Sequence, residues 1–430
     1  MHSEHFLRDV LATGDHNPVI ARCDVYASGR IKLVKRGVRL TSAMYDQLVN
    51  HKLLEPLEQC LDVEHGVRRD SLAQAVRALL VPGGHFALLT QQVTRGKLAS
   101  AFSNVALPAP IAFKLTIARE QRPRLFEHSI EVALLAVYLA ARSGWDSMGL
   151  THAAAAGLLH DLGELHLDPV LFDRARPLRA EEYEFIYSHP VSAYLIVQAQ
   201  LEYPALVRDA VLEHHERLDG SGYPRGLRAG TISELGQILA AAEVGAVLFR
   251  RAKQTGVSAE LDVPVRMMWH QFDPQLIGFL ADLLAIEPPS GNPATIGGLK
   301  GHRQQLQAIA DVLIDWSRTR IEIEACADED ARDALLGFVT ARVDRLNRVL
   351  LATGFDPRDV DGFVGMLAND GTLGGELSAI AHEATWAFGE VRLELRRRWG
   401  EFAAMPQPSR AAVEAWLARA DARMGSIAPG

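Results

Sequence analysis

The sequence predicts a mainly α-helical protein with a small α+β module at its N-terminus. Residues 112–285 are dominated by alanine and leucine, with breaks at isolated glycines and prolines, so this region is expected to be almost entirely helical. Residues 300–425 carry apolar side chains at helical spacing over long runs, which predicts a helical bundle. Apolar and polar residues alternate over 19–39, the pattern of a strand. We therefore expect three regions: 1–110, 111–287 and 294–430.

Length and composition are those of a protein with two or three domains. The chain has 430 residues, of which 48% are hydrophobic and 23% charged. Its net charge of -8 argues against DNA or RNA as a partner. The apolar stretches are shorter than the roughly 20 residues that cross a bilayer, and no signal peptide is evident, so we expect no membrane association and a cytoplasmic location. The odd, widely separated cysteines Cys23, Cys60 and Cys326 favour a reducing compartment without a disulfide framework.

The first region is expected to contain a short hairpin followed by helices. Apolar and polar residues alternate around Ser28-Gly29, which predicts that Ala21–Ala27 pairs with Arg30–Lys35. No motif assigns a role to this region. The expected helices and linker are Thr41 or Ser42 to Leu48, Leu53–Leu61 and, as the linker, Leu107–Pro110.

The third region follows a second linker at 288–293, which is rich in proline and glycine. Its long helices are expected to bury one apolar face each, and the resulting bundle is a candidate surface for a homodimer or a protein partner. The expected helices are Gln304–Ile323, Ala331–Leu351, Leu377–Trp399 and Ser409–Met424.

The chemistry is concentrated in the central region, where His214 to Pro224 reads His-His-Glu-Arg-Leu-Asp-Gly-Ser-Gly-Tyr-Pro. Adjacent residues of a helix point about 100° apart, so His214 and His215 can serve one site only at the end of a helix. The Asp-Gly and Ser-Gly pairs permit a tight loop, and the proline stiffens its exit. Taken alone, this segment is most simply one buried and one solvated histidine beside an ordinary turn.

Residues of the same kind occur before and after this segment. His128 lies on an amphipathic helix, His160 and Asp161 are adjacent, His189 precedes a proline, and Glu243 lies in an apolar run. Neutral imidazoles and carboxylate oxygens suit iron, manganese, zinc or magnesium. One bridging aspartate, several histidines and a further carboxylate can hold two metals about 3.5–4 Å apart, the arrangement that hydrolyses a phosphodiester.

Residues 122–250 resemble an HD-GYP domain, the branch of the HD phosphohydrolase superfamily that includes cyclic di-GMP phosphodiesterases. The resemblance implies an HD-type all-helical catalytic domain over 111–287. Its HHExxDGxGYP pattern is highly specific. It rests on His128, His160-Asp161, His189, His214-His215, Gly222-Tyr223-Pro224 and the segment from Arg225 to Ile232.

The resemblance also implies two divalent metal ions, of iron, manganese, zinc or magnesium. Asp161 is expected to bridge them, because a carboxylate has two oxygens. A metal-held water would then have its pKa lowered to about 7 and would attack the phosphorus. The implied metal ligands are His128, His160, Asp161, His189, His214, His215 and Glu243.

Asp161 and Glu164 are the candidate catalytic residues. For each arginine of the loop, a solvated charge is as strongly expected as a phosphate contact. The candidate substrate contacts are Gly222, Tyr223, Pro224, Arg225 and Arg228.

The sequence departs from the family pattern in its phosphate-binding residues. Glu164 replaces a lysine, exchanging a cation that attracts phosphate for an anion that repels it. Glu243 stands where aspartate is usual and is one methylene longer. Phe249–Lys253 replaces a substrate-contacting Arg-Pro-Tyr-Arg segment. Arg124 occupies the place of a glutamate that supports a third metal in some members, so two metals are expected here.

Three functions are compatible with these observations. The first is a phosphodiesterase that hydrolyses cyclic di-GMP to pGpG or GMP. The second is a catalytically weak domain that regulates through nucleotide or protein binding. The third is a hydrolase of another cyclic dinucleotide or phosphoester. The complete ligand set favours catalysis, whereas Glu164 and the missing segment favour the other two.

Overall fold

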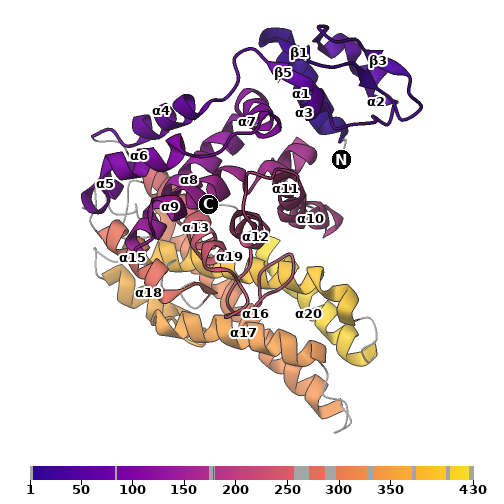
Figure 1. The fold of residues 1–430 in the computed structure, drawn as a ribbon. Coiled ribbons are helices and arrows are strands. Elements are labelled where there is room, and N and C mark those ends of the chain that lie inside the picture. The colour runs from indigo at the N-terminus through magenta and orange to yellow at the C-terminus, as the bar shows by residue number, and fades with distance from the viewer. Residues whose placement is uncertain are drawn as a thin grey trace. The chain divides into compact units, whose positions relative to one another are not determined.

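The computed structural model divides the chain into two compact units. They comprise Met1–Arg250 with His270–Leu283, and Arg251–Trp269 with Leu284–Gly430. The chain is mainly helical, as predicted, and the strands of its described part lie near the N-terminus (Figure 1). None of the described helices is long and apolar enough to cross a membrane. The described residues are 3–82, 85–173, 178, 180–255, 271–285, 297–326, 334–369, 374–402 and 407–425.

A three-stranded antiparallel sheet organises the N-terminal part. Its central strand β1 (Val19–Ala21) pairs with β4 (Arg39–Leu40) on one side and β5 (Leu61–Val63) on the other. Val19 and Ala21 are buried whereas Ile20 is exposed, so one face of β1 packs on the core. The surrounding helical elements are α1 (Glu4–His16), η1 (Ser42–Met44), α2 (Tyr45–Val49) and α3 (Leu57–Cys60).

The predicted hairpin is present in a shorter form. β2 (Val25–Tyr26) pairs with β3 (Lys32–Val34), inside the two predicted segments. Ala21, at the predicted start of the first segment, belongs instead to β1. The predicted helix over Leu53–Leu61 is reduced to α3, because Leu53 forms a β-bridge with Ala27.

The expectation of no disulfide is wrong, because Cys23 and Cys60 are joined. Their Cα atoms are 5.2 Å apart although 37 residues separate them in sequence. The cause is the sheet: Ala21 pairs with Leu61, so the residues that follow β1 and precede β5 are brought together. Cysteine spacing alone does not reveal such a strand pairing.

The helices that hold the site pack around α8 (Pro123–Arg142), whose residues from Val132 to Ala140 are fully buried. α9 (Ser147–Leu159) lies directly against it, since a Cβ on Gly157 would overlap the backbone of Ala133. The other elements of this region are α4 (Arg69–Leu79), η2 (His85–Leu88), α5 (Leu89–Gln92), α6 (Arg95–Ser103), α7 (Ala109–Gln121), η3 (Leu162–His166), η4 (Pro169–Phe172), α10 (Ala180–Tyr187), α11 (His189–Gln198), α12 (Ala205–Glu213), α13 (Glu234–Thr255) and α15 (Pro274–Ala285).

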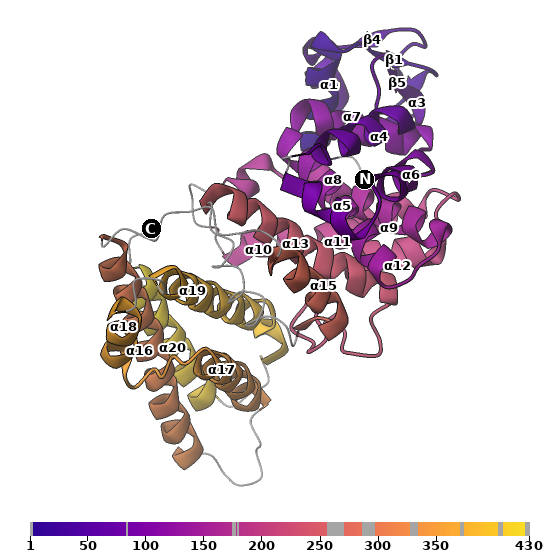
Figure 2. The same ribbon diagram turned by 90° about the vertical axis from the view of Figure 1, so that its left-hand side faces the viewer.

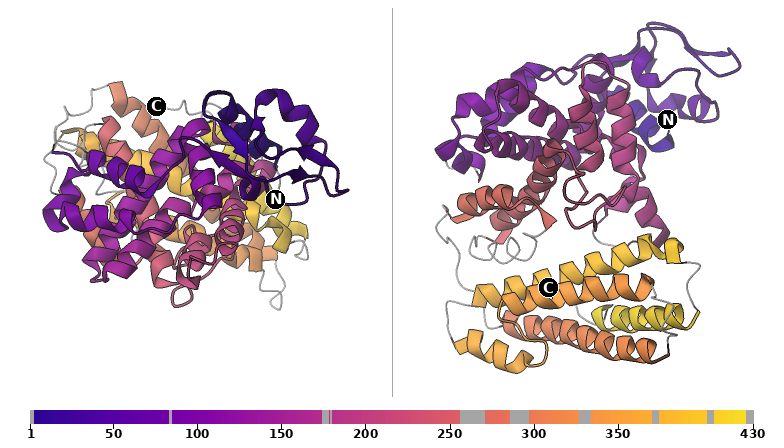
Figure 3. Two further views of the ribbon diagram at one scale, coloured as in Figure 1. Left: turned by 45° about the horizontal axis from the view of Figure 1, so that its top comes forward. Right: turned by 60° about the horizontal axis from the view of Figure 1, so that its bottom comes forward.

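The second unit contains the predicted helical bundle, whose long helices lie side by side (Figures 2 and 3). Trp316 and Trp416 fill its core with ring centroids 4.8 Å apart. The predicted linker at 288–293 lies outside the described residues. The elements are α16 (Gly297–Cys326), α17 (Ala334–Ala352), α18 (Val360–Asn369), α19 (Gly374–Arg397), η7 (Trp399–Phe402) and α20 (Gln407–Gly425).

Candidate metal centre

The structure brings all seven predicted metal ligands together in two neighbouring groups. Within each group, the potential ligand atoms lie within 4.8 Å of one another. The ligands come from α8, the end of α9, the residue before η3, the start of α11, the end of α12, and α13. The Asp161 group comprises Asp161, His189, His214 and His215, and the His128 group comprises His128, His160 and Glu243.

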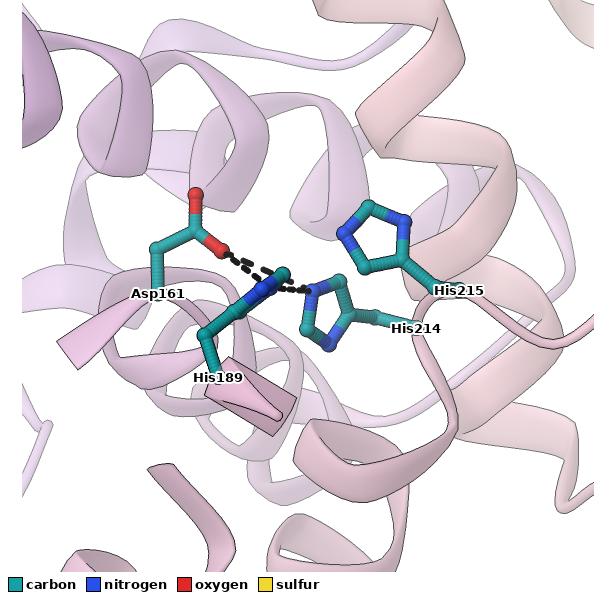
Figure 4. A group of neighbouring side chains, drawn as sticks. All are labelled: Asp161, His189, His214 and His215. Atoms are coloured by element: carbon teal, nitrogen blue, oxygen red, sulfur yellow. Dashed lines mark hydrogen bonds and ion pairs between the residues drawn. The ribbon is translucent and has the colours of Figure 1, made fainter. Parts of the chain in front are cut away.

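Two histidines of the Asp161 group point their Nε2 atoms at the same carboxylate oxygen (Figure 4). Asp161 Oδ1 lies 3.2 Å from His189 Nε2 and 3.5 Å from His214 Nε2. The Nδ1 atoms of the two rings lie 2.6 Å and 2.7 Å from the carbonyl oxygens of Ile186 and Val211. A carbonyl only accepts hydrogen bonds, so each Nδ1 carries a proton, and each ring in its neutral form presents a lone pair at Nε2.

These two lone pairs face each other, with the Nε2 atoms of His189 and His214 only 3.1 Å apart. Burial lowers the pKa of His214 to about 4, so this ring is neutral at physiological pH. Two neutral acceptors at this distance repel each other unless a cation lies between or beside them. The arrangement therefore fits a metal ion better than a hydrogen-bonded pair.

The His128 group meets the other oxygen of Asp161. Asp161 Oδ2 lies 3.0 Å from His160 Nε2 and 3.6 Å from His128 Nε2. Glu243 Oε2 lies 3.0 Å from His128 Nε2 and 3.3 Å from His160 Nε2. Asp161 thus directs one oxygen to each group, as a carboxylate bridging two cations must.

Unsatisfied polar atoms give a further test of whether a metal fits. His160 Nε2, Asp161 Oδ1 and Glu243 Oε2 are buried and make no hydrogen bond within the described part of the chain. Buried polar groups are normally hydrogen-bonded, and a bound cation is one way to satisfy several acceptors at once. The donor set of imidazoles and carboxylates therefore fits divalent ions.

The pKa values of Asp161 and His160 also indicate a site that favours a cation. Burial alone would raise the pKa of Asp161, but His160 and the other nearby histidines outweigh it and hold that pKa well below its usual value. Burial alone would lower the pKa of His160, but Asp161 and Glu243 outweigh it and raise that pKa well above its usual value. The two carboxylates therefore favour positive charge beside them.

The glycine-rich loop packs tightly behind His215. A Cβ on Gly222 would overlap the backbone atoms of Glu216, Arg217 and His215, so only glycine fits there. The Tyr223 ring stacks on the His215 ring with centroids 4.5 Å apart, and it also lies 4.5 Å from the Tyr187 ring. Pro224 follows Tyr223 in this loop.

Two buried glutamates that the sequence analysis did not single out anchor this loop. Glu216 accepts hydrogen bonds from the backbone N–H groups of Arg225 and Leu227, at 2.7 Å and 2.8 Å. Glu213 accepts from the Arg225 guanidinium at 2.6 Å and from the Ser233 N–H at 2.8 Å. The signal in the sequence was a glutamate on each side of the histidine pair, one of them within an apolar helix.

Arg225 and Arg228 were predicted to contact the substrate. Among the described residues, neither side chain forms a hydrogen bond to a predicted metal ligand. Arg225 pairs with Glu213, and its side chain is 45% exposed. Arg228 is exposed, and its side chain lies beside Gly220. In this conformation the Arg225 side chain holds the loop to α12, and a substrate contact by either arginine stays a prediction.

Glu164 lies in η3, three residues after Asp161. Burial, followed by the Asp161 carboxylate, raises the pKa of Glu164 well above its usual value. In the metal-free protein Glu164 therefore favours its neutral form, rather than the repelling anion that the sequence suggested. Gly163 allows this turn to approach α11, since a Cβ there would overlap the His189 carbonyl oxygen.

A sequence profile described as HD domain matches residues 114–276. This segment contains both ligand groups. Residues 114–276 form an HD domain. The predicted relationship to HD phosphohydrolases is thus confirmed.

Several relatives of this chain are named as cyclic dinucleotide phosphodiesterases. One is cyclic di-GMP phosphodiesterase PA4108 of Pseudomonas aeruginosa, 30% identical over 38% of this chain and 40% of the relative. Another is 3'3'-cGAMP-specific phosphodiesterase 1 of Vibrio cholerae, 33% identical over 34% of this chain and 33% of the relative. The matches therefore span less than half the length of these relatives. Among solved structures, the HDG"Y"P protein Bd1817 of Bdellovibrio bacteriovorus aligns with a TM-score of 0.35 and 16% identity, over 62% of this chain and 95% of that one.

Proposed function

We propose that the HD domain is a metal-dependent phosphodiesterase that hydrolyses cyclic di-GMP to pGpG or GMP. The observation that carries the proposal is the Asp161 carboxylate, which directs one oxygen to each group of ligands. Relatives named as cyclic di-GMP phosphodiesterases support the substrate class. A homodimer or protein partner and a cytoplasmic location stay predictions.

Two bound divalent ions, held by the Asp161 and His128 groups, would supply charge neutralisation on the phosphate and a water with its pKa lowered to about 7. The protein's own part is to fix the ligands. Carbonyl oxygens hold the Nδ1 atoms of His160, His189 and His214, at 2.8 Å, 2.6 Å and 2.7 Å, and so aim each Nε2 inward. No covalent intermediate with the protein is required.

The aromatic pair beside the ligands is a candidate base-binding surface. Tyr223 and Tyr187 are half-buried, with ring centroids 4.5 Å apart, and Tyr223 lies directly on His215. Stacking of a base on an aromatic ring contributes about 1–3 kcal/mol. These rings therefore suit a guanine base whose phosphodiester lies over the metal ligands.

A second candidate substrate is 3'3'-cGAMP, because relatives named as specific for this dinucleotide are 33% and 29% identical to this chain over their matched parts. It also contains guanine and two phosphodiesters, so the ligand groups do not discriminate between the two. The choice depends on the pocket for the second base.

A hydrolysis assay with a matched pair of variants tests the proposal. Protein prepared without oxygen and loaded with Mn²⁺ would be incubated with cyclic di-GMP or 3'3'-cGAMP, and the products separated by chromatography. Asp161→Asn should lower turnover at least about 100-fold, because loss even of groups that only orient metal ligands costs 10–100-fold. Asp209→Asn makes the same change at an exposed position of α12 and should retain wild-type turnover.

Failure of wild-type protein with two bound ions to cleave either dinucleotide would contradict the proposal. It would favour a regulatory domain or a hydrolase of another phosphoester. Cleavage of 3'3'-cGAMP alone would replace the substrate but keep the reaction.

A further inference from the structure

Arg250 contacts a predicted metal ligand from the side opposite the metal-binding atoms. Its Nη2 atom lies 3.0 Å from His128 Nδ1 and 2.8 Å from Glu131 Oε2. His128 and Glu131 are three residues apart on α8 and so lie on one face of that helix. Arg250 lies on α13, in the segment that replaces the family's Arg-Pro-Tyr-Arg.

The donor and acceptor roles in this contact are fixed by chemistry. A guanidinium has only N–H donors, so His128 Nδ1 must be the acceptor. A neutral His128 ring then carries its proton on Nε2, where Glu243 Oε1 lies 3.1 Å away and accepts it. A protonated Nε2 has no lone pair for a metal ion.

The other ligand histidines with a contact at Nδ1 show the opposite arrangement. His160, His189 and His214 each place Nδ1 against a backbone carbonyl, at 2.8 Å, 2.6 Å and 2.7 Å. The Nε2 atoms of all three rings therefore point into the site, and a neutral ring held in this way offers its lone pair there. His128 is thus held in the tautomer that does not bind a metal through Nε2.

We infer that Arg250 is a positioning residue that makes the two metal subsites unequal. The Asp161 group takes the first divalent ion in its existing tautomers. The His128 group takes the second only when His128 moves its proton from Nε2 to Nδ1, one proton being released to water and one taken up. The new Nδ1–H would face the Arg250 N–H, so the guanidinium must turn away and keep only its bond to Glu131.

This inference rests on the proposed metal centre, but it does not depend on the substrate. Binding of the second ion breaks the hydrogen bond from the Arg250 guanidinium to His128 Nδ1. Removing this charged donor should therefore tighten binding at the weaker site about tenfold. Binding at the Asp161 group should not change. The affinity of the second ion alone therefore reports on Arg250.

Calorimetric titration of the metal-free full chain with Mn²⁺ gives the first test. Wild type should show two classes of site. Arg250→Leu should tighten only the weaker one, about tenfold. Arg250→Lys keeps a cationic donor and should resemble wild type. Arg142→Leu removes another arginine–carboxylate pair, the one between α8 and Asp282, and should leave both affinities unchanged.

Histidine ¹⁵N NMR of the metal-free protein tests the His128 tautomer directly. This measurement uses wild-type protein, so it does not depend on whether Arg250→Leu folds. The His128 signal, identified by its loss in His128→Gln, should show the proton on Nε2, whereas the His189 and His214 signals should show it on Nδ1. Arg250→Lys should preserve this pattern.

Several results would overturn the inference. They are a His128 proton on Nδ1 in wild type, two equal Mn²⁺ affinities in wild type, or an unchanged weaker site in a folded Arg250→Leu protein. Each leaves the proposed phosphodiesterase intact. Absence of Mn²⁺ binding altogether would refute the metal centre as well.

Discussion

Gly222 occupies a place in which no side chain fits. Replacing it with alanine would press a methyl group against the backbone of Glu216, Arg217 and His215. We expect Gly222→Ala to lower the free energy of unfolding by about 1–3 kcal/mol, the usual cost of overpacking. Because His215 is one of the displaced residues, bound Mn²⁺ should fall too. Urea unfolding and metal content measure the two effects.

Gly278→Ala is the matched control, because a Cβ at this position of α15 meets nothing within 4 Å. Replacing this helical glycine with alanine should raise the free energy of unfolding by about 0.5–1 kcal/mol. Equal behaviour of the two variants would show that the loop is not packed as described.

Sequence reasoning could single out this cluster because metal chemistry restricts ligands to a few residue types, which occur here in an ordered pattern. All seven predicted ligands lie in the two groups. It missed Arg250, because the contact with His128 joins residues 122 positions apart and has no sequence signature. It also missed Glu213 and Glu216, whose role depends on the path of the loop that they bind.

Among the helices, α3, α7 and η3 meet at a buried lysine. Lys114 Nζ lies 2.9 Å from Glu58 Oε1 and 3.2 Å from His166 Nε2, and the Lys114 side chain is only 2% exposed. The Phe6 ring of α1 covers the ammonium, with its centroid 4.0 Å from Nζ. This contact ties the N-terminal helices to the turn that follows Asp161.

We expect Lys114→Met to lower the free energy of unfolding by about 3 kcal/mol, because it leaves Glu58 without its buried partner. The double variant Lys114→Met with Glu58→Leu removes both charges and should recover most of the loss. Urea unfolding at neutral pH measures both. A double variant as unstable as the single one would show that the charge pair itself stabilises the fold.

The destabilisation caused by Lys114→Met should depend on pH, because the Lys114 side chain can lose a proton. Burial, opposed by Glu58, lowers the pKa of Lys114 below its usual 10.5, so the folded protein releases this proton at a lower pH than the unfolded chain. Stability from this group therefore rises with pH between the folded and unfolded pKa values. The loss caused by Lys114→Met should accordingly be larger just below pH 10.5 than at neutral pH.

Sequence patterns predicted the helices better than the strands. Apolar periodicity reports on a helix from within one segment, so α16, α17, α19 and α20 lie where long helices were expected. Strand pairing depends on distant partners, and β1 pairs with β4 and β5 rather than extending the hairpin. The same long-range pairing produced the disulfide that cysteine spacing did not predict.

Over the whole molecule, each compact unit has its own core. The core of the second unit includes Trp316, Phe388 and Trp416, and the Trp416 indole N–H donates to the Val312 carbonyl oxygen at 3.2 Å. None of the seven predicted metal ligands belongs to this unit. The two units should therefore respond separately to a mutation in one core.

Trp416→Ala tests this separation. Removing a fully buried tryptophan should destabilise the second unit by about 3–5 kcal/mol, since the lost contacts leave a cavity. The protein should then unfold in two steps in urea, followed by circular dichroism, while Mn²⁺ binding keeps its wild-type affinity. Trp386→Ala, at a position of α19 that is 42% exposed, should change neither. Loss of Mn²⁺ together with the first unfolding step would instead mean that the HD domain depends on the helical bundle for its own stability.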